Sequence, residues 1–401
     1  MKIIDVAEHY AEAGGGVRTY VDHKLRAGAA LGHEVVIVAP AAENREEKRN
    51  GGRILWVESP PMPGDPRYHV FVKQKPVHDL LEREKPDVVE GSSVYAGGWF
   101  AGGYTGSAIK SLIFHQDPVA VYGHSFLDRY LKSGRIDRLA KPIWAYLRRL
   151  AERFDTTVVA GDWLRERLTS FGLPRVSAVP FGIDAEPFVA SQRDEKLRRR
   201  LLLQAGLSSE AALLVAVSRH HPEKRLPTLI EAVQIVSRAR PVGLVIFGDG
   251  PSRRRIETLA SRAAGVAIAG YTRDRKVLAQ AVASADGFLH GSAAETYGLV
   301  VAEAVCAGTP LVVPDTGGAA DLARPEFAET YRAGDPEACA AAIRRLLSRD
   351  PNTLRAACLS AAKKPRTLDA HFAELFEHYR QLVERLNGRA AEHPIESALA
   401  S

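Results

Sequence analysis

Hydrophobic positions fall into short runs rich in β-branched residues, and these runs alternate with longer segments rich in Ala, Leu and Arg. Such alternation is typical of βαβ units, which form a mainly parallel sheet with helices on both faces. We expect a helix near Val17–Leu31. The first-half strands are expected at KIIDV (2–6), HEVVIVAP (33–40), GRILWVES (52–59), PDVVEGS (86–92), SLIFHQD (111–117), DTTVVAG (155–161) and VSAVPFG (176–182).

The pattern pauses at PFGIDAEPF, Pro180–Phe188, continues with a charged helix at 194–207, and then repeats. Five more strands are expected at ALLVAVSR (212–219), VGLVIFGDGP (242–251), GVAIAG (265–270), ADGFLHG (285–291) and TPLVVPD (309–315). Without any strict sequence repeat, the two sets predict an α/β protein with two doubly wound domains facing a cleft.

We place the predicted domains at residues 1–185 and 186–370. A C-terminal amphipathic segment, 371–390, is expected to form a helix that stops at Asn387-Gly388, because Asn and Gly are common just after helix ends. The remaining residues have the composition of a frayed tail.

Composition fits a globular protein of two domains, since 46% of the 401 residues are hydrophobic and 25% are charged. No N-terminal signal pattern and no apolar run of roughly 20 residues is present, so we expect neither a signal peptide nor a membrane-spanning helix. Cys306, Cys339 and Cys358 are few and odd in number, which indicates reduced thiols. We therefore expect a cytoplasmic protein.

A basic segment between Arg129 and Arg153 is the main charge asymmetry, with eight Lys or Arg against two acidic residues. One interpretation is a solvated helix face. The other is contact with an anionic surface, such as a membrane leaflet or a lipid-linked diphosphate, in which case the interleaved Trp144, Tyr146 and Leu147 would lie on a peripheral membrane face. No nucleic-acid-binding motif accompanies the segment, so a nucleic-acid partner ranks last.

Two glutamates lie eight residues apart in HGSAAETYGLVVAEAVCAGTP, residues 290–310. Glu295 lies in the loop after an expected strand, whereas Glu303 lies inside the helix expected from Gly298 to Ala307, with Gly308 after its end. A buried carboxylate is costly unless it is paired, so each should meet a partner or a ligand. The alternative is that Glu295 only caps the helix and Glu303 is a surface residue.

The N-terminus of this expected helix has the features of a phosphate site at the carboxyl edge of a parallel sheet. The backbone N–H groups of Gly298, Leu299 and Val300 and the positive end of the helix dipole favour an anion. Hydroxyl groups on either side of a diphosphate could then donate hydrogen bonds to Glu295 and Glu303. That pattern matches a sugar, a diphosphate and a ribose in a row.

Cations and glycines at neighbouring strand ends support the same site. Arg219 and Lys224, in AVSRHHPEKR, follow one strand, and both suit phosphate binding. Gly248 and Gly250 follow the next strand, and Gly270 with Tyr271 follows the third. Each signal is weak alone, because loop cations are usually solvated and a G-x-G pair is common.

Together, SRHHPEKR, GDGP, AGYTRD and ETYGLVVAEAVCAGTPLVVPDTGG resemble the donor half of a retaining glycosyltransferase with the GT-B fold. More narrowly, they resemble the large family four with its E-x7-E motif, which includes sucrose synthases and bacterial mannosyl- and glucosyltransferases. AGGGVRTYV resembles the family's glycine-rich acceptor-side loop, VPFGID its interdomain linker, and the last helix its return crossing.

The resemblance implies a role for each matched residue. Arg219 and Lys224 would neutralise the donor diphosphate, Glu295 would bind the transferred sugar, and Glu303 would bind the ribose. His115, after the strand SLIFHQD, would face the sugar from the acceptor side. The other implied donor-binding residues are Gly15, Gly16, Gly248, Gly250, Gly270, Tyr271, Tyr297, Gly298, Leu299 and Val300.

Two departures from the family pattern concern the linker and the acceptor side. Phe181 stands where the family often has Asn, which affects hinge packing. After His115 comes Gln116-Asp117-Pro118, whereas many members place Asp directly after the His. The sequence therefore does not decide which polar group lies beside His115 on the acceptor side.

The expected enzyme moves a hexosyl group from a nucleoside diphosphate sugar with retention and without a metal or other cofactor, with UDP-hexose slightly preferred to GDP-mannose. The acceptor is expected to be a lipid, lipid-linked or glycan molecule at the inner membrane face. An acceptor or membrane surface is predicted at Arg18, Lys73, Arg148 and Arg149. A small soluble acceptor, a sugar-nucleotide epimerase and a non-catalytic nucleotide-sugar-binding protein remain as alternatives.

Overall fold

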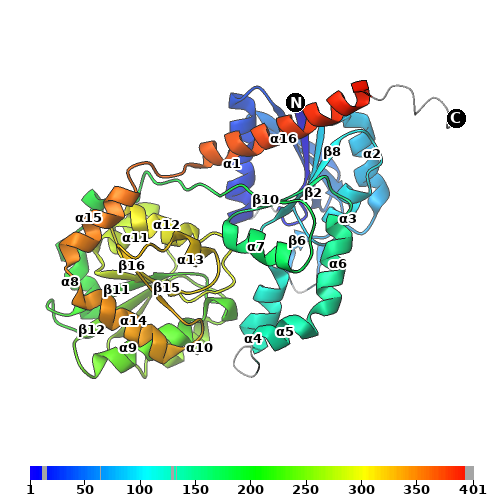
Figure 1. Cartoon of the computed structure of the whole chain (residues 1–401). Coiled ribbons are helices and arrows are strands. Elements are labelled where there is room, and N and C mark those ends of the chain that lie inside the picture. The colour runs from blue at the N-terminus through cyan, green and yellow to red at the C-terminus, as the bar shows by residue number, and fades with distance from the viewer. Residues whose placement is uncertain (11–15, 64, 128–130, 132, 393–401) are drawn as a thin grey trace.

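The computed structural model describes residues 1–10, 16–63, 65–127, 131 and 133–392, which form two lobes (Figure 1). Within these residues the first sheet has the strand order β10-β9-β8-β7-β1-β2-β4-β3, in which only the β3–β4 pair is antiparallel. Its strands are β1 (Lys2–Val6), β2 (Glu34–Ala41), β3 (Arg45–Arg49), β4 (Gly52–Glu58), β7 (Val88–Gly91), β8 (Ile109–Phe114), β9 (Thr156–Val159) and β10 (Val176–Ala178). A separate antiparallel pair consists of β5 (Pro61–Met62) and β6 (Asp65–His69).

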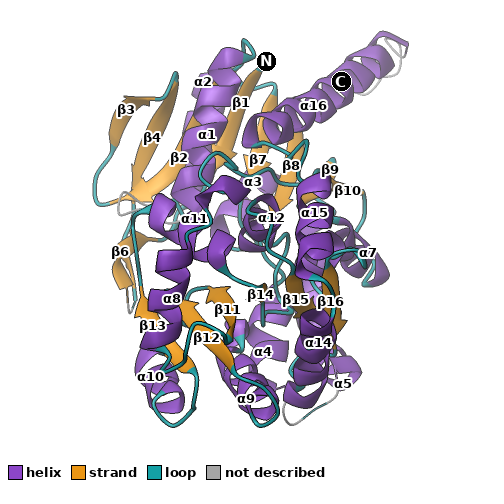
Figure 2. Ribbon diagram, turned by 90° about the vertical axis from the view of Figure 1, so that its left-hand side faces the viewer, coloured by secondary structure: helices purple, strands orange, loops and turns teal. Residues whose placement is uncertain are grey.

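Helices cover both faces of this sheet, as Figure 2 shows from the side. They are α1 (Gly16–Ala30), α2 (Gln74–Glu84), α3 (Ala96–Gly103), the π-helix η1 (Val119–His124), α4 (Ser125–Leu127), α5 (Ser133–Leu139), α6 (Lys141–Ala151) and α7 (Asp162–Ser170). Consecutive residues of β1 belong to opposite cores, since Ile3 lies in the same cluster as Leu25 and Ile4 in the same cluster as Leu112. Burial on both faces explains the apolar residues Ile3, Ile4 and Val6, and the strand also carries the buried Asp5.

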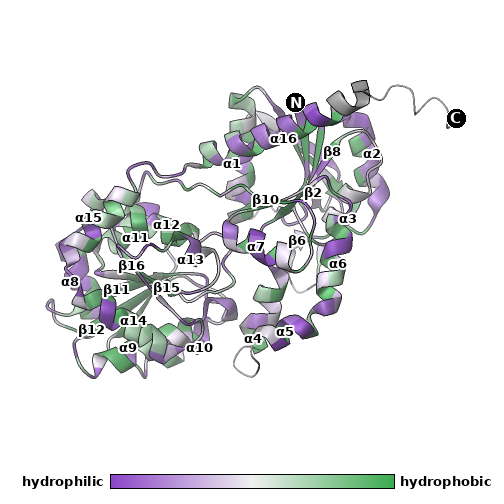
Figure 3. Ribbon diagram, viewed as in Figure 1, coloured by the Kyte–Doolittle hydropathy of each residue, from purple (hydrophilic) through white to green (hydrophobic). Residues whose placement is uncertain are grey.

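The second sheet has the order β13-β12-β11-β14-β15-β16 within the described residues, and all of its strand pairs are parallel. Its strands are β11 (Ala212–Val217), β12 (Val242–Phe247), β13 (Val266–Gly270), β14 (Gly287–Leu289), β15 (Leu311–Pro314) and β16 (Ala328–Tyr331). In each lobe, the apolar strands of its sheet lie in the interior (Figure 3).

The helices of the second half also lie on both faces of its sheet. They are η2 (Ala190–Gln192), α8 (Glu195–Gln204), η3 (Pro222–Lys224), α9 (Leu226–Ser237), α10 (Arg253–Ala260), α11 (Arg275–Ser284), α12 (Leu299–Cys306), α13 (Gly318–Leu322), α14 (Pro336–Ser348) and α15 (Pro351–Ala361). None of the helices in the described part of the chain is both long and apolar enough to cross a membrane.

The two lobes are joined by two crossing segments that run side by side (Figure 1). The linker residue Ile183 forms a parallel bridge with Thr367, and its N–H donates to the carbonyl of Arg366 at 2.8 Å. A side chain at Gly182 would place its Cβ 1.9 Å from the carbonyl oxygen of Thr367, so the close approach of the crossings requires glycine. Helix α16 (Leu368–Glu392) then packs on α1 and the first sheet through Phe372, Phe376 and their neighbours.

Two expectations about secondary structure were incomplete or wrong. The expected strands are present, but β3, β16 and the β5–β6 pair were not predicted. Strand β3 is REEKR, an edge strand whose charge hides its antiparallel pairing, and β16 is only four residues long. The helix predicted to stop at Asn387-Gly388 continues to Glu392. One internal glycine costs only about 1 kcal/mol, and the helix-forming residues after it continue the helix. The division at residues 185 and 370 stays a prediction.

Candidate active site

The N-terminus of α12 lies at the carboxyl edge of the second sheet, after β14, as the sequence predicted. Gly298 is the N-cap, with φ 95° in the left-handed region that favours glycine; it has no side chain to cap the first turn, and its own N–H donates to the carboxylate of Glu295. Leu299 is exposed and Val300 half-buried. The helix ends at Cys306, one residue before the predicted end at Ala307, and Gly308 follows with φ 75°. An uncapped helix start of this kind leaves backbone N–H groups available to an anion.

Glu295, in the loop before α12, is held by a cation. The Nζ of Lys224 donates to Oε2 of Glu295 at 2.9 Å, and the buried His290 places its Nε2 3.6 Å from the same oxygen. Burial is the largest influence on Glu295 and would raise its pKa, but Lys224, His290 and the backbone N–H of Gly298 together outweigh it and the pKa is lowered. Glu295 is therefore a carboxylate at neutral pH that can accept hydrogen bonds from sugar hydroxyls.

Lys224 and Arg219 share the buried carboxylate of Glu223. Glu223 Oε1 lies 3.8 Å from Lys224 Nζ and 3.5 Å from Arg219 Nη2. Burial lowers the pKa of Lys224, yet Glu295 and Glu223 together raise it above the ordinary value. The Arg219 side chain is 64% exposed, so its guanidinium is open to a ligand. Lys224 thus stays charged, and both predicted phosphate ligands lie after the same strand.

Glu303 meets a partner that the sequence analysis did not find. The Nη2 of Arg275, the first residue of α11, donates to Glu303 at 3.0 Å and to the carbonyl of Asp184 in the linker at 3.2 Å. The same guanidinium lies over Phe188, 5.2 Å from the ring centre. Burial raises the pKa of Glu303 to about 7 although Arg275 lowers it. Arg275 therefore joins the proposed ribose carboxylate to the segment that links the lobes.

The predicted glycines occupy neighbouring loops. Gly248 and Gly250 have φ values of 130° and 155°, and a Cβ at Gly248 would lie 1.9 Å from the carbonyl oxygen of Ser218. The backbone at these two glycines therefore lies close to the loop that carries Arg219. Gly270 has φ 80° with open space beside it, and the Tyr271 side chain is 67% exposed. No contact joins Tyr271 to the glutamates among the described residues.

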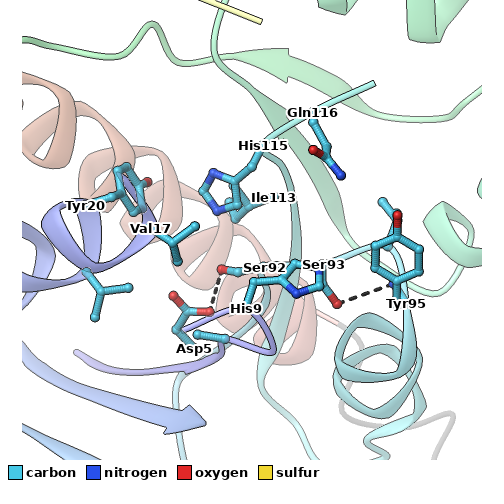
Figure 4. A pocket seen from close by; sticks show the side chains of 13 residues that line it. Asp5, His9, Val17, Tyr20, Ser92, Ser93, Tyr95, Ile113, His115 and Gln116 are labelled. Carbon is cyan, nitrogen blue, oxygen red and sulfur yellow. Dashed lines mark hydrogen bonds between the residues drawn. The ribbon is translucent and has the colours of Figure 1, made fainter. Parts of the chain in front are cut away.

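In the first half, His115 follows β8 and lines a cavity with Asp5, His9, Tyr95 and Gln116 (Figure 4). The cavity has a volume of about 100 Å³. Burial lowers the pKa of His115 to about 4, so the imidazole is neutral at pH 7. A neutral imidazole can donate one hydrogen bond and accept another, which suits contact with a sugar or acceptor hydroxyl.

The two halves meet at His115 and the α12 loop. The Oγ1 of Thr296 donates to the carbonyl oxygen of His115 at 3.1 Å. Phe181 of the linker lies between the rings of His115 and Tyr297, with ring centres 6.2 and 6.0 Å away. Phe181, which replaces the family's common Asn, thus packs in the hinge as expected. The structure places His115 beside the residue that follows Glu295.

The Gln116-Asp117 departure has a structural explanation. Asp117 is fully buried, accepts from the backbone N–H groups of Val119 and Ala120 at 2.8 and 3.0 Å, and pairs with Arg167. Asp117 therefore holds the start of the π-helix η1, and Gln116 lines the cavity in its place.

The basic segment is amphipathic, and of the three apolar side chains proposed for a membrane face only Tyr146 is exposed. Trp144 and Leu147 are buried in the first core, and Trp144 stacks on Phe171 at 4.0 Å between ring centres. These two residues therefore cannot face a membrane, because the core needs them. The exposed face of α5 and α6 instead carries Arg135, Arg138, Leu139, Lys141, Ile143, Arg148 and Arg149.

The other predicted acceptor or membrane residues lie on separate elements. Lys73 is exposed just before α2, and Arg18 of α1 lies 3.7 Å from Asp22. Gly16 is the first residue of α1. Gly15 lies outside the described residues, as do Arg129 and Lys132 of the basic segment.

Sequence reasoning missed Glu223, His290 and Arg275. His290 ends the strand run of FLHGS and Arg275 begins the helix after AGYTRD, so both occupy strand-end positions like those that were singled out. Their chemistry becomes visible only through the carboxylates that they contact.

Comparison with known families covers both halves. The family model described as Glycosyltransferase Family 4 matches residues 14–187, and the model described as Glycosyl transferases group 1 matches residues 211–349.

Curated relatives are similar over nearly the whole chain. A GDP-mannose-dependent alpha-(1-6)-phosphatidylinositol dimannoside mannosyltransferase of Mycobacterium tuberculosis is 30% identical over 89% of this chain and 90% of its own. A GDP-mannose-dependent alpha-mannosyltransferase of Mycolicibacterium smegmatis is 30% identical over 98% of this chain and 100% of its own.

Solved structures share the fold. Sucrose-phosphate synthase from Thermosynechococcus elongatus superposes with a TM-score of 0.72 at 18% identity, over 96% of this chain and 100% of its own. Anabaena HepE in complex with UDP and glucose gives a TM-score of 0.66 at 15% identity, over 94% and 98%. Two lobes with parallel sheets, the matched family models and these relatives agree: the chain belongs to glycosyltransferase family 4 and has the GT-B fold.

Proposed function

We propose that the protein transfers a mannosyl group from GDP-mannose to a hydroxyl group of a phosphate-bearing lipid acceptor, with retention at the anomeric carbon and without a metal. The relatives from Mycobacterium tuberculosis and Mycolicibacterium smegmatis support GDP-mannose as the donor, because both are named as GDP-mannose-dependent. These names weigh against the slight preference for UDP-hexose that was expected from the sequence. No structural feature tests the choice between the two donors.

One observation carries the proposal: two carboxylates flank an uncapped helix N-terminus, and two cations adjoin it. Glu295 with Lys224 lies before α12, Glu303 lies inside it, and Arg219 stays exposed beside Lys224. A nucleoside diphosphate sugar presents hydroxyls, two phosphates and a ribose in the same order. The buried carboxylates suit the hydroxyls, and the cations and N–H groups suit the phosphates.

The chemical step follows from where charge develops. The bond between the anomeric carbon and the diphosphate oxygen breaks, and a bond to the acceptor oxygen forms on the same face. The acceptor proton passes to the leaving phosphate oxygen, so no protein nucleophile is needed. Lys224, Arg219 and the N–H groups of α12 stabilise the departing diphosphate, an electrostatic role that often supplies the largest part of catalysis.

Other residues position the reactants. His115 reaches the sugar from the first half as a neutral hydrogen-bonding group, and its carbonyl contact with Thr296 joins the lobes around the reaction. Closing the lobes over the cleft excludes water, which would otherwise hydrolyse the donor.

The exposed basic face of α5 and α6 supports a lipid acceptor at a membrane surface. Arg148 and Arg149 could contact anionic headgroups, while Leu139 and Ile143, 67% and 46% exposed, could enter the interface. The name of the Mycobacterium tuberculosis relative, which acts on a phosphatidylinositol dimannoside, supports the same acceptor class.

The test is a transfer assay with GDP-mannose and UDP-glucose as donors and phosphatidylinositol mannosides as acceptors. We expect transfer from GDP-mannose, unaffected by EDTA, and an α-linked product by NMR. A β-linked product would overturn retention, and transfer only to free sugars would favour a soluble acceptor. Conversion of the donor sugar without any acceptor would indicate the epimerase.

A further inference from the structure

A second cavity has a basic lining and lies next to the segment that ends at Lys224. It has a volume of about 290 Å³ and lies beside η3. We call it the Arg255 cavity. Its lining residues are Phe126, His221, Pro222, Arg225, Pro227, Thr228, Ser252, Arg255, Ile256, Ala333 and Gly334. Among these described residues there are two guanidinium groups, an imidazole and two hydroxyls, and no carboxylate, so the lining favours an anion.

Arg255 is the clearest feature of this cavity. Its guanidinium forms no ion pair or hydrogen bond with any residue that the structure describes, and the residue is exposed. Because this arginine lines a cavity and has no carboxylate partner, the N–H donors of its guanidinium are available to a ligand. Phosphate matches these donors in a bidentate way.

Arg225, which also lines the cavity, has an unusual backbone conformation. Its φ and ψ are 46° and 36°, the left-handed region that residues with a Cβ adopt at a cost in free energy. Glycine would adopt it freely, yet the chain has arginine there. Such costs are found most often at binding sites, where the side chain compensates for them.

Backbone dipoles add to these charges. Ser252 and Arg225 are the N-cap residues of α10 and α9, and neither has a side-chain cap. Both helix N-termini therefore border the cavity with partial positive charge. The third helix start nearby, α14, is already capped by Asp335, so it contributes less.

The cavity is also built from both lobes. Phe126, of α4 in the first half, is 49% exposed and lines it together with the second-half residues. A ligand in the Arg255 cavity would therefore touch both lobes. Its second-half wall begins at His221, three residues before Lys224.

We propose that the Arg255 cavity is a second phosphate-binding site, separate from the donor diphosphate site and shared between the lobes. Its ligand is the phosphate group of a phosphomonoester or phosphodiester. This phosphate belongs either to the acceptor or to a free phosphorylated small molecule. Only the first of these sources rests on the proposed function.

Calorimetry on the full chain, with GDP saturating the donor site, tests the proposal. The probes are inorganic phosphate and glycerophosphoinositol. We expect Arg255→Ala to weaken binding roughly tenfold, the loss of a charge-assisted contact, and Arg254→Ala to leave it unchanged. Arg254 is the matched control, because it is exposed, adjacent and also without an ion pair, but does not line the cavity. Arg225→Gly keeps the left-handed backbone and should weaken binding at least as much.

Absence of binding to the wild type with GDP present, or equal weakening by Arg254→Ala and Arg255→Ala, would overturn the proposal. Transfer to a phosphatidylinositol mannoside in phosphatidylcholine vesicles then identifies the source of the phosphate. A raised acceptor KM with unchanged kcat in Arg255→Ala assigns the site to the acceptor. An unchanged KM assigns it to a free phosphorylated molecule. Lack of any transfer by the wild type would contradict the proposed function and leave the calorimetric result standing.

Discussion

Each half of the protein has a lysine between two carboxylates, and the two lysines differ in what surrounds them. Lys24 of α1 lies between Asp5 and Glu90, fully buried, with its Nζ 2.8 Å from Asp5. Lys224 lies between Glu295 and Glu223, and its side chain is 19% exposed at the α12 loop.

The environments have opposite effects on the two ammonium groups. Burial lowers the pKa of Lys24, although Asp5 raises it, whereas the carboxylates around Lys224 overcome burial and raise its pKa. Tyr379 of α16 seals the Lys24 cluster by donating to Glu90 at 2.5 Å. The same residue types therefore have different roles. The closed Lys24 cluster joins elements of the fold, whereas the partly open Lys224 cluster can replace a contact within the protein by a contact with a ligand.

The largest effect is expected from Lys24→Met. The substitution leaves Asp5 and Glu90 buried without their cation, which should lower the free energy of unfolding by about 3–5 kcal/mol. Urea unfolding measures this loss. Adding Glu90→Gln should recover part of it, and a loss below about 1 kcal/mol would contradict a structural role for the cluster.

The same substitution at the other lysine should act on catalysis. Lys224→Met removes a cation from the leaving diphosphate, so kcat/KM for transfer should fall about 10²–10³-fold, with a much smaller change in urea midpoint than Lys24→Met gives. Steady-state assays and unfolding curves of both variants form one comparison. If Lys224→Met unfolds the protein as much as Lys24→Met, the distinction between the clusters is wrong.

Another buried carboxylate, Glu303, sharpens the comparison through pH. Its pKa of about 7, above the ordinary 4.5, means that the protonated form stabilises the fold below about pH 4.5 and that this contribution is lost as pH rises through 7. The wild type should therefore lose about 2 kcal/mol relative to Glu303→Gln between pH 5 and pH 8. Glu295, with its lowered pKa, should show no such loss over that range. Unfolding free energies at several pH values, with Glu295→Gln as the control, measure both.

The smallest effect concerns the seal on the Lys24 cluster. Tyr379→Phe removes hydrogen bonds to Glu90 and Ser111 without changing the packing, which should cost about 1.5 kcal/mol. Transfer activity per folded molecule should stay near the wild-type value. A large drop in kcat with unchanged stability would instead connect α16 to the chemistry.

Much of the fold was predictable because apolar runs and strand-end loops are local signals. All strands of the two sheets except β3 and β16 were found this way, and so were the helix from Gly298 and the residues Glu295 and Glu303. The edge strand β3 was missed because its residues are charged and its pairing with β4 is invisible in its own sequence. The apolar residues of α6 were assigned to a membrane face because periodicity cannot tell a core from another apolar surface.

The sequence by itself determined the α/β architecture, the two sets of strands and the loop chemistry around α12, because hydrophobic periodicity and glycine positions depend on neighbours along the chain. Tertiary structure alone decided which cation meets which carboxylate. Lys224 pairs with Glu295 across 71 positions, and Arg275 pairs with Glu303 across 28. Such pairs form where distant strand ends converge, and the burial that shifts their pKa values exists only once the chain is folded.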